Sequence, residues 1–263
     1  MDAHPADTTY SIRQALAVSS NIALARIVTD GYDGSAKKFV QKLKRMGVCD
    51  SVDYIIPGAD QSKIDIPNDT VTISKMAYGY SVELSPLQMA MLYNGIANNG
   101  KLITPVLVTK VQKEDDVLEE FESEVIRNSI CSDRTLEEIQ ACLHDVVWDN
   151  DLGTASVYKW KGHIAKYKAQ SKIVAIAGKT GTAQVLENGK YNSHKHRMSF
   201  VGYFPEDAPQ YTCICVIHAP RNKGYYDAGM DCGSVVRNIA EKTMAYSNEY
   251  VIDGKELVFR KRQ

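Results

Sequence analysis

A lysine and two threonines stand together at the end of an apolar run, in the order Lys179, Thr180, Gly181 and Thr182. Residues 173–177, Ile-Val-Ala-Ile-Ala, indicate a buried strand that runs into this polar edge. The lysine supplies a positive charge, and the threonine hydroxyls can bind a carboxylate. Glycine leaves room for the close approach of another element or a ligand. The segment therefore predicts a binding site for an anionic group on a strand.

A second polar cluster interrupts an apolar helical pattern near the N-terminus. Residues 15–25 read Ala-Leu-Ala-Val-Ser-Ser-Asn-Ile-Ala-Leu-Ala, and Ser and Asn side chains compete for backbone hydrogen bonds. The cluster predicts a break between two helices. Two interpretations stay open: Ser19 or Ser20 only caps the second helix, or Ser19 and Asn21 do chemistry with Lys179.

The two clusters, in this order, resemble the second and third motifs of penicillin-binding proteins, Ser-x-Asn and Lys-Thr-Gly. Nearly the whole chain is similar to the C-terminal part of a class B penicillin-binding protein, the transpeptidase that cross-links peptidoglycan. It resembles the cell-division (septal) type most. The sequence departs from the family at 231–234, Asp-Cys-Gly-Ser, where the family has a small residue and a proline. The resemblance is carried by 9–21, 78–90, 98–101 with Pro105, and 199–205.

The family's first motif, Ser-x-x-Lys, does not occur before Ser19. The one serine upstream, Ser11, is followed by Ile-Arg-Gln, and the matches at Ser35 and Ser156 lie downstream. By resemblance we expect the acylated serine, two strands and the membrane anchor to precede an artificial start at Met1. The chain would then be a truncated, inactive transpeptidase domain.

The resemblance also implies a role for each residue of the two clusters. Ser19 would relay a proton to the leaving amine, and Asn21 would hold the lysine of the first motif or the substrate amide. Lys179 would keep the pocket positive and orient Ser19. The N–H of Thr182 would form half of an oxyanion hole. The implied substrate-binding residues are Thr180, Gly181 and Thr182.

Composition sets limits on partners and location. The 263 residues carry 31 Lys and Arg against 32 Asp and Glu, a net charge of −1, which gives no electrostatic case for nucleic acid. The resemblance implies the outer, periplasmic face of the bacterial inner membrane. It also implies peptidoglycan stem peptides, β-lactam antibiotics and division-complex proteins as partners, and no cofactor.

Two other functions remain open alongside the transpeptidase. One is a non-catalytic scaffold or binding module with the penicillin-binding fold. The other is a serine hydrolase that uses Ser35 or Ser156, although Ser35 reads more simply as a helix N-cap. Acylation of a downstream serine by a penicillin would indicate the hydrolase, whereas a Ser-x-x-Lys motif encoded upstream would separate the transpeptidase from the scaffold module.

The cysteines and histidines indicate no metal site. Residues 194–196 (His-Lys-His) and 213–215 (Cys-Ile-Cys) could supply four zinc ligands if their strands paired. We favour instead a solvated turn for the histidines, because Asn and Gly residues precede them, and apolar packing for the cysteines. The six cysteines are expected to be free thiols, largely buried.

The resemblance implies one α+β domain over 1–263, in which an antiparallel sheet is flanked by helices and three of its strands, 172–185, 197–204 and 210–218, remain. Residues 161–172 are expected to form a solvated connector. The strand 210–218 is apolar and uncharged, a poor open edge, so we expect a second chain, another piece of the protein or the strand 256–260 to cover it. The expected helices are 9–29 (broken near Ser20), 34–46, 70–78, 85–98, 132–148 and 230–247. The other expected strands are 102–112, 118–124, 172–185 and 197–204.

Overall fold

The computed structural model describes residues 9–51, 63–64, 70–187, 190–220, 226–247, 250–253 and 256–259. The chain divides into two compact units. One lies within Ser20–Glu138, and the other combines Thr8–Ser19 with Ile139–Gln263. The helix that ends just before Ser19 therefore belongs with the C-terminal half of the chain.

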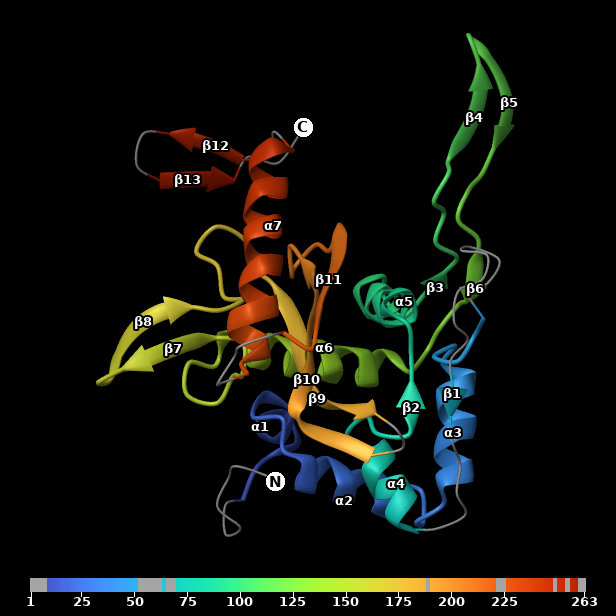
Figure 1. The fold of residues 1–263 in the computed structure, drawn as a ribbon. Helices are drawn as coiled ribbons and strands as arrows, with labels where there is room; N and C mark the ends of the chain where they lie inside the picture. The colour runs from blue at the N-terminus through green and yellow to red at the C-terminus, as the bar shows by residue number, and fades with distance from the viewer. Residues whose placement is uncertain are drawn as a thin grey trace. The chain divides into compact units, whose positions relative to one another are not determined.

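The C-terminal unit is built on a three-stranded antiparallel sheet in the order β11-β10-β9, whose strands overlap the expected 172–185, 197–204 and 210–218 (Figure 1). The inward side chains Met198 and Phe200 on the central strand are fully buried, which fixes its register. Both β9 and β11 are edges of this sheet among the described residues. The strands are β9 (Ala177–Glu187), β10 (Lys190–Phe204) and β11 (Tyr211–His218).

Helix α7 (Ser234–Tyr246) packs on this sheet through side chains one turn apart. Val236, Ala240 and Met244 are all fully buried, as the four-residue spacing of one helix face requires. A short π-helix, Gly229–Gly233, leads into α7, so residues 231–234, which depart from the family pattern, form the end of this turn and the first residue of α7.

Helices α1 (Ile12–Ala17) and α6 (Asp133–Trp148) complete this unit, although the first residues of α6 lie in the other one. A capping box between Ser11 and Gln14 starts α1. Arg13 forms a bidentate pair with Asp145 of α6, with N–O distances of 2.7 and 2.8 Å. This pair ties α1 to a helix more than a hundred residues away.

The N-terminal unit is mainly helical. Ala36, Val40, Ile73 and Met76 form a small buried cluster between two of its helices. Its helices are α2 (Asn21–Gly31), α3 (Ala36–Arg45), α4 (Thr70–Met76) and α5 (Pro86–Ala97). Its strand pairs are β1 (Lys63–Ile64) with β2 (Val82–Glu83), β3 (Leu102–Ile103) with β6 (Val125–Arg127), and β4 (Lys110–Lys113) with β5 (Asp116–Glu120).

Four expectations for strands and connecting segments were wrong. The strand expected over 102–112 is divided between β3 and β4, and the one over 118–124 between β5 and β6. The expected connector 161–172 instead contains a hairpin of β7 (Val157–Trp160) and β8 (His163–Tyr167). The C-terminal strand β13 (Glu256–Phe259) pairs with β12 (Tyr250–Asp253), so it does not cover β11.

The histidine region was also assigned incorrectly, because His194 and His196 lie within β10 and not in a turn. Cys215 pairs with Phe200, four positions along the strand from His196, so the four possible zinc ligands do not converge. All six cysteines are free, as expected. Two of them, Cys142 and Cys232, are buried, and the other four are partly exposed. Among the described helices, none has the length and apolar character needed to cross a bilayer.

Candidate active site

The break between α1 and α2 places Ser19 in an unusual backbone conformation. Val18 ends α1, and Ser19 follows with a φ of 58°, in the left-handed region that non-glycine residues rarely adopt. Ser20 then caps α2, where its hydroxyl accepts a hydrogen bond from the N–H of Ala23. The capping interpretation therefore holds for Ser20, which leaves the hydroxyl of Ser19 available for other contacts.

Lys179 meets Ser19 across 160 residues of sequence. Its Nζ donates to Ser19 Oγ at 2.9 Å, so the predicted proximity of the two clusters is confirmed for this pair. The same ammonium group lies 3.1 Å from the carbonyl oxygen and 3.4 Å from the hydroxyl of Thr180. Neighbouring side chains point to opposite faces of a strand, so the long lysine side chain reaches around the open edge of β9 to make these contacts.

The surroundings of Lys179 disfavour its charge. No carboxylate in the described part of the chain forms an ion pair with it, and its three partners are neutral oxygens. Burial lowers the pKa of Lys179 from 10.5 to about 8. The ammonium form dominates at neutral pH, yet a measurable fraction is the free amine. Lys179 can therefore both donate to the Ser19 hydroxyl and, once deprotonated, accept its proton.

Gly181 faces a side chain of the neighbouring strand. A Cβ at this position would lie 2.7 Å from Ser199 Oγ on β10, the residue that pairs with it. Gly178 is more restricted, because a Cβ there would lie 2.5 Å from the carbonyl oxygen of Val201. These glycines let β9 and β10 approach closely, and they hold the strand that carries Lys179 against the centre of the sheet.

Thr154 is a residue of this region that sequence reasoning missed. Its hydroxyl lies 2.8 Å from the hydroxyl of Thr180, and its N–H donates to the carbonyl of Ala17 at 3.2 Å. Its own carbonyl accepts from Lys168 Nζ, which also pairs at 2.9 Å with the largely buried Asp227. Thr154 thus connects the end of α1, two residues before Ser19, to the strand that carries Lys179.

The remaining predicted residues are placed without such contacts. Thr182 is exposed on β9, and its hydroxyl has no hydrogen-bond partner among the described residues. Asn21 is the first residue of α2 and belongs to the N-terminal unit. The structure therefore brings together Ser19, Lys179 and Thr180, whereas the placement of Asn21 beside Lys179 stays a prediction.

Neither downstream serine has the environment of a nucleophile. Ser35 caps α3. Lys38, which would be the lysine of the Ser-x-x-Lys match at this serine, is paired with Asp33 at 2.7 Å. Ser156 is 1% exposed and its hydroxyl donates to the carbonyl of Gly153 at 2.8 Å. A serine hydrolase built on either residue is therefore not supported.

A profile of the penicillin-binding protein transpeptidase domain matches residues 2–244, and the chain belongs to this family. It is 24% identical over 169 residues to stage V sporulation protein D of Bacillus subtilis, covering 64% of this chain and 24% of that protein. It is 24% identical over 210 residues to a probable peptidoglycan D,D-transpeptidase, PbpC, of Pseudomonas aeruginosa, covering 79% of this chain and 32% of that protein. The chain thus spans a quarter to a third of the length of these relatives.

Solved structures confirm the fold. Penicillin-binding protein 2X of Streptococcus thermophilus superimposes with a TM-score of 0.76 at 21% identity, over 92% of this chain and 34% of that one. Penicillin-binding protein 3 of Mycobacterium tuberculosis, solved with aztreonam, superimposes with a TM-score of 0.73 at 21% identity, over 99% of this chain and 57% of that one. The predicted α+β transpeptidase fold is confirmed.

Proposed function

We propose that the chain is a transpeptidase domain, over 1–263, of a peptidoglycan D,D-transpeptidase of the cell-division type. The observation that carries the proposal is the 2.9 Å contact between Lys179 and Ser19, which links two polar clusters far apart in sequence. Relatives named as peptidoglycan D,D-transpeptidases support the same chemistry. The reaction joins stem peptides through an acyl-serine intermediate, and β-lactams acylate the same serine.

The proton transfer follows from the lysine and serine pair. A leaving amine must gain a proton as the acyl-enzyme forms. Ser19 passes its hydroxyl proton to that amine and recovers one from Lys179, whose pKa of about 8 makes this transfer easy near neutral pH. Asn21 is assigned to the lysine of the first motif or to the substrate amide.

Substrate binding is divided between two threonines. The hydroxyl of Thr180 is already engaged by Thr154 and Lys179, whereas that of Thr182 is exposed and unpartnered within the described residues. Thr182 is therefore the hydroxyl best placed to receive the terminal carboxylate, with the positive charge of Lys179 behind it. The edge of β9 can pair with an extended peptide, and the N–H of Thr182 serves the oxyanion.

The nucleophile is assigned to a Ser-x-x-Lys motif outside the 263 residues, since none precedes Ser19. Without it, the chain alone forms no acyl-enzyme. The periplasmic location and the division-complex partners belong to the same proposal. The competing function, a non-catalytic scaffold module, shares the missing motif and differs in whether the Lys179 region binds a peptide carboxylate.

Two measurements test the proposal. Intact-mass analysis after incubation with penicillin should show no adduct, and an adduct on any serine of the chain would contradict the assignment. Ligand-observed NMR with diacetyl-Lys-D-Ala-D-Ala should show weak binding that Lys179→Met abolishes. Lys172→Met is the matched control, because Lys172 lies over the ring of Tyr167 and serves no predicted role. Equal binding by both variants would favour the scaffold module.

A further inference from the structure

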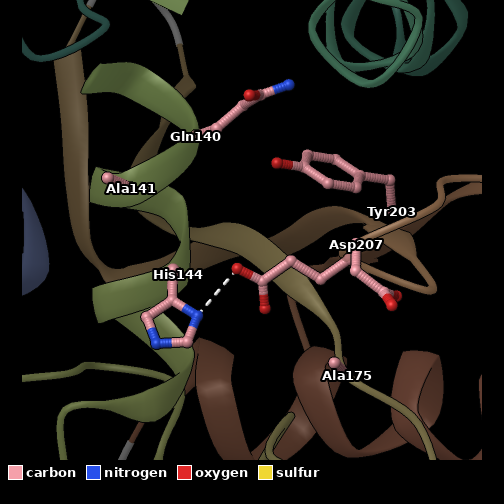
Figure 2. A pocket seen from close by; sticks show the side chains of 7 residues that line it. Gln140, Ala141, His144, Ala175, Tyr203 and Asp207 are labelled. Carbon is pink, nitrogen blue, oxygen red and sulfur yellow. Dashed lines mark hydrogen bonds and ion pairs between the residues drawn. The ribbon is translucent and has the colours of Figure 1, made fainter. Parts of the chain in front are cut away.

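A cavity of about 390 Å³ lies in the C-terminal unit, between α6 and the end of β10 (Figure 2). It shares no residue with the group formed by Ser19, Lys179 and Thr180. Three of its residues come from α6 and three from the end of β10 and the turn after it. The lining residues are Gln140, Ala141, His144, Ala175, Tyr203, Glu206 and Asp207.

A tyrosine hydroxyl faces this cavity without a described partner. Tyr203 is 1% exposed, and its hydroxyl makes no hydrogen bond with any residue that the structure describes. Figure 2 shows the phenol directed toward α6, on the side of Gln140 and His144. The hydroxyl of a largely buried tyrosine normally finds a hydrogen-bond partner, either a protein group or water. Its position at the cavity wall makes it available to a polar group bound there.

Negative charge exceeds positive charge around the cavity. One oxygen of Glu206 is bound by His144 Nδ1 at 2.7 Å, and the other has no described partner. Asp207 adds a second carboxylate, whereas nearby Asp145 is engaged by Arg13. Burial raises the pKa of Glu206, and Asp207 and Asp145 raise it further, against the opposing effect of His144. A cation in the cavity would relieve this excess.

Apart from Gln140, the rest of the wall is apolar. Ala141 and Ala175 present methyl groups, and the ring of Tyr203 presents an aromatic surface. A ligand that matches the cavity needs an alkyl stem for these groups and a cationic head with N–H donors for Glu206 and the tyrosine oxygen. A simple metal ion would leave the apolar wall unused, and no cluster of three metal-ligating side chains exists among the described residues.

We propose that this cavity binds an alkylammonium or alkylguanidinium group, with its cationic head on Glu206 and Tyr203 and its stem against Ala141 and Ala175. Such a group occurs in free amines and in the lysine and arginine side chains of partner proteins. The proposal does not depend on the transpeptidase activity, because it uses a different set of residues.

Trp148 provides a direct readout. It stacks on His144 with ring centroids 6.0 Å apart, so a ligand that rearranges His144 and Glu206 changes its fluorescence. The chain has two tryptophans, so Trp160→Phe leaves Trp148 as the only reporter. Titration with n-butylammonium chloride should give a saturable change, with a dissociation constant on the order of millimolar for so small a ligand. Sodium butyrate, n-butanol and sodium chloride at the same concentrations should give none.

Variants assign the response to the cavity. Glu206→Gln keeps the shape of the side chain and should weaken butylammonium binding at least about tenfold. Tyr203→Phe should weaken butylammonium binding severalfold. If Glu206→Gln does not fold, the Tyr203→Phe result tests the proposal by itself. The control is Asp151→Asn, a surface carboxylate that pairs with Lys159 and lies outside the lining. Unchanged binding in Tyr203→Phe and in a folded Glu206→Gln, or an equal response to butyrate, would overturn the proposal.

A pair of peptides distinguishes the two possible sources of the cation, a free amine and a side chain of a partner protein. Acetyl-Gly-Lys-Gly-amide and the same peptide with norleucine in place of lysine are titrated beside butylammonium. Tighter binding of the lysine peptide assigns the cavity to a partner's side chain, and tighter binding of the free amine assigns it to a small metabolite. If neither cation binds, the cavity is not a cation site.

Discussion

Lys179 keeps an ammonium group in a place that does not favour charge. Its hydrogen bonds go to Ser19 and to Thr180, all of them neutral oxygens, and no described carboxylate pairs with it. Hydrogen bonds alone do not replace the lost hydration of a buried ammonium group. The lowered pKa reflects a loss of folding stability, and it also allows the amine to donate and accept a proton near neutral pH.

This cost predicts how stability changes with pH. Below about pH 8, Lys179 is protonated in both the folded and unfolded states, and its charge then destabilises the folded state to the full extent. Between about pH 8 and 10.5 the unfolded chain holds the proton more strongly, so the free energy of unfolding gains a contribution that rises with pH. The total is about 3 kcal/mol. Urea denaturation of wild type and Lys179→Met at pH 7 and 10 measures it, because other titrating groups cancel in the difference. An equal pH dependence in both proteins would show that Lys179 is not the source.

Thr154 gives a second prediction at this scale. Thr154→Val keeps the volume and removes the hydroxyl that contacts Thr180. We expect a loss of about 1 kcal/mol in the free energy of unfolding. The matched control is Thr212→Val on β11, since the hydroxyl of Thr212 is buried with no described partner. That change should be neutral or stabilising, and equal losses in both variants would show that the Thr154 contact contributes nothing.

Sequence reasoning found part of this site because the chemistry restricts the residue types. The Lys-Thr-Gly-Thr segment and Ser19 stand out against apolar runs, and their contact was predicted. Thr154 lies in an ordinary turn, where nothing local indicates a hydroxyl 26 residues away in sequence from its partner. The cavity lined by Tyr203 and Glu206 was also missed, because it depends on the packing of α6 against the end of β10.

At the scale of elements, the helices were predicted best. Their apolar spacing and N-caps, such as Ser35 and Ser85, are local signals, and observed ends fall close to the predicted ones. The β7–β8 hairpin was missed because its basic residues read as a solvated loop. Its turn, Lys161-Gly162, has φ values of 49° and 82°, which lysine rarely supplies and which Asn-Gly would have signalled.

The turn of this hairpin is testable by itself. Gly162→Ala places a Cβ at a φ of 82° and should destabilise the hairpin by about 1 kcal/mol. Lys161→Asn should stabilise it by a smaller amount, because asparagine tolerates positive φ. Amide exchange of residues 157–167 should become faster in the first variant and slower in the second. Changes spread equally over α7 and the main sheet would show that the turn is not a local determinant.

At the scale of the molecule, β11 is an open sheet edge among the described residues. Its sequence is apolar and uncharged until His218, and both Tyr211 and Val216 are 38% exposed. The three strands of this sheet were expected from the family resemblance and their apolar runs, whereas their order and the pairing of β13 with β12 were not predicted. An isolated strand of that length carries no register signal strong enough to choose a partner.

The open edge predicts self-association. We expect β11 to be covered by a second copy of the chain or by another piece of the protein, with slow amide exchange over 211–217. Sedimentation at rising concentration should detect a dimer, and Val216→Lys should shift it toward monomer. If the chain stays monomeric at high concentration and the amides of β11 exchange fast, β11 is not covered by a second copy of the chain. The exposed Val235→Lys on α7 is the matched control for the added charge.

The contact between Lys179 and Ser19 also has a consequence for biosynthesis. Ser19 and α1 leave the ribosome 160 residues before the strand that they contact. At the usual rates of synthesis, about 5 to 20 residues per second, that delay is roughly 10 to 30 seconds. The N-terminal unit, within Ser20–Glu138, can fold during this interval, whereas α1 must wait with Ala15 and Ala17 unburied. The contact between Ser19 and Lys179 therefore forms late, between two segments of the nascent chain that lie 160 residues apart.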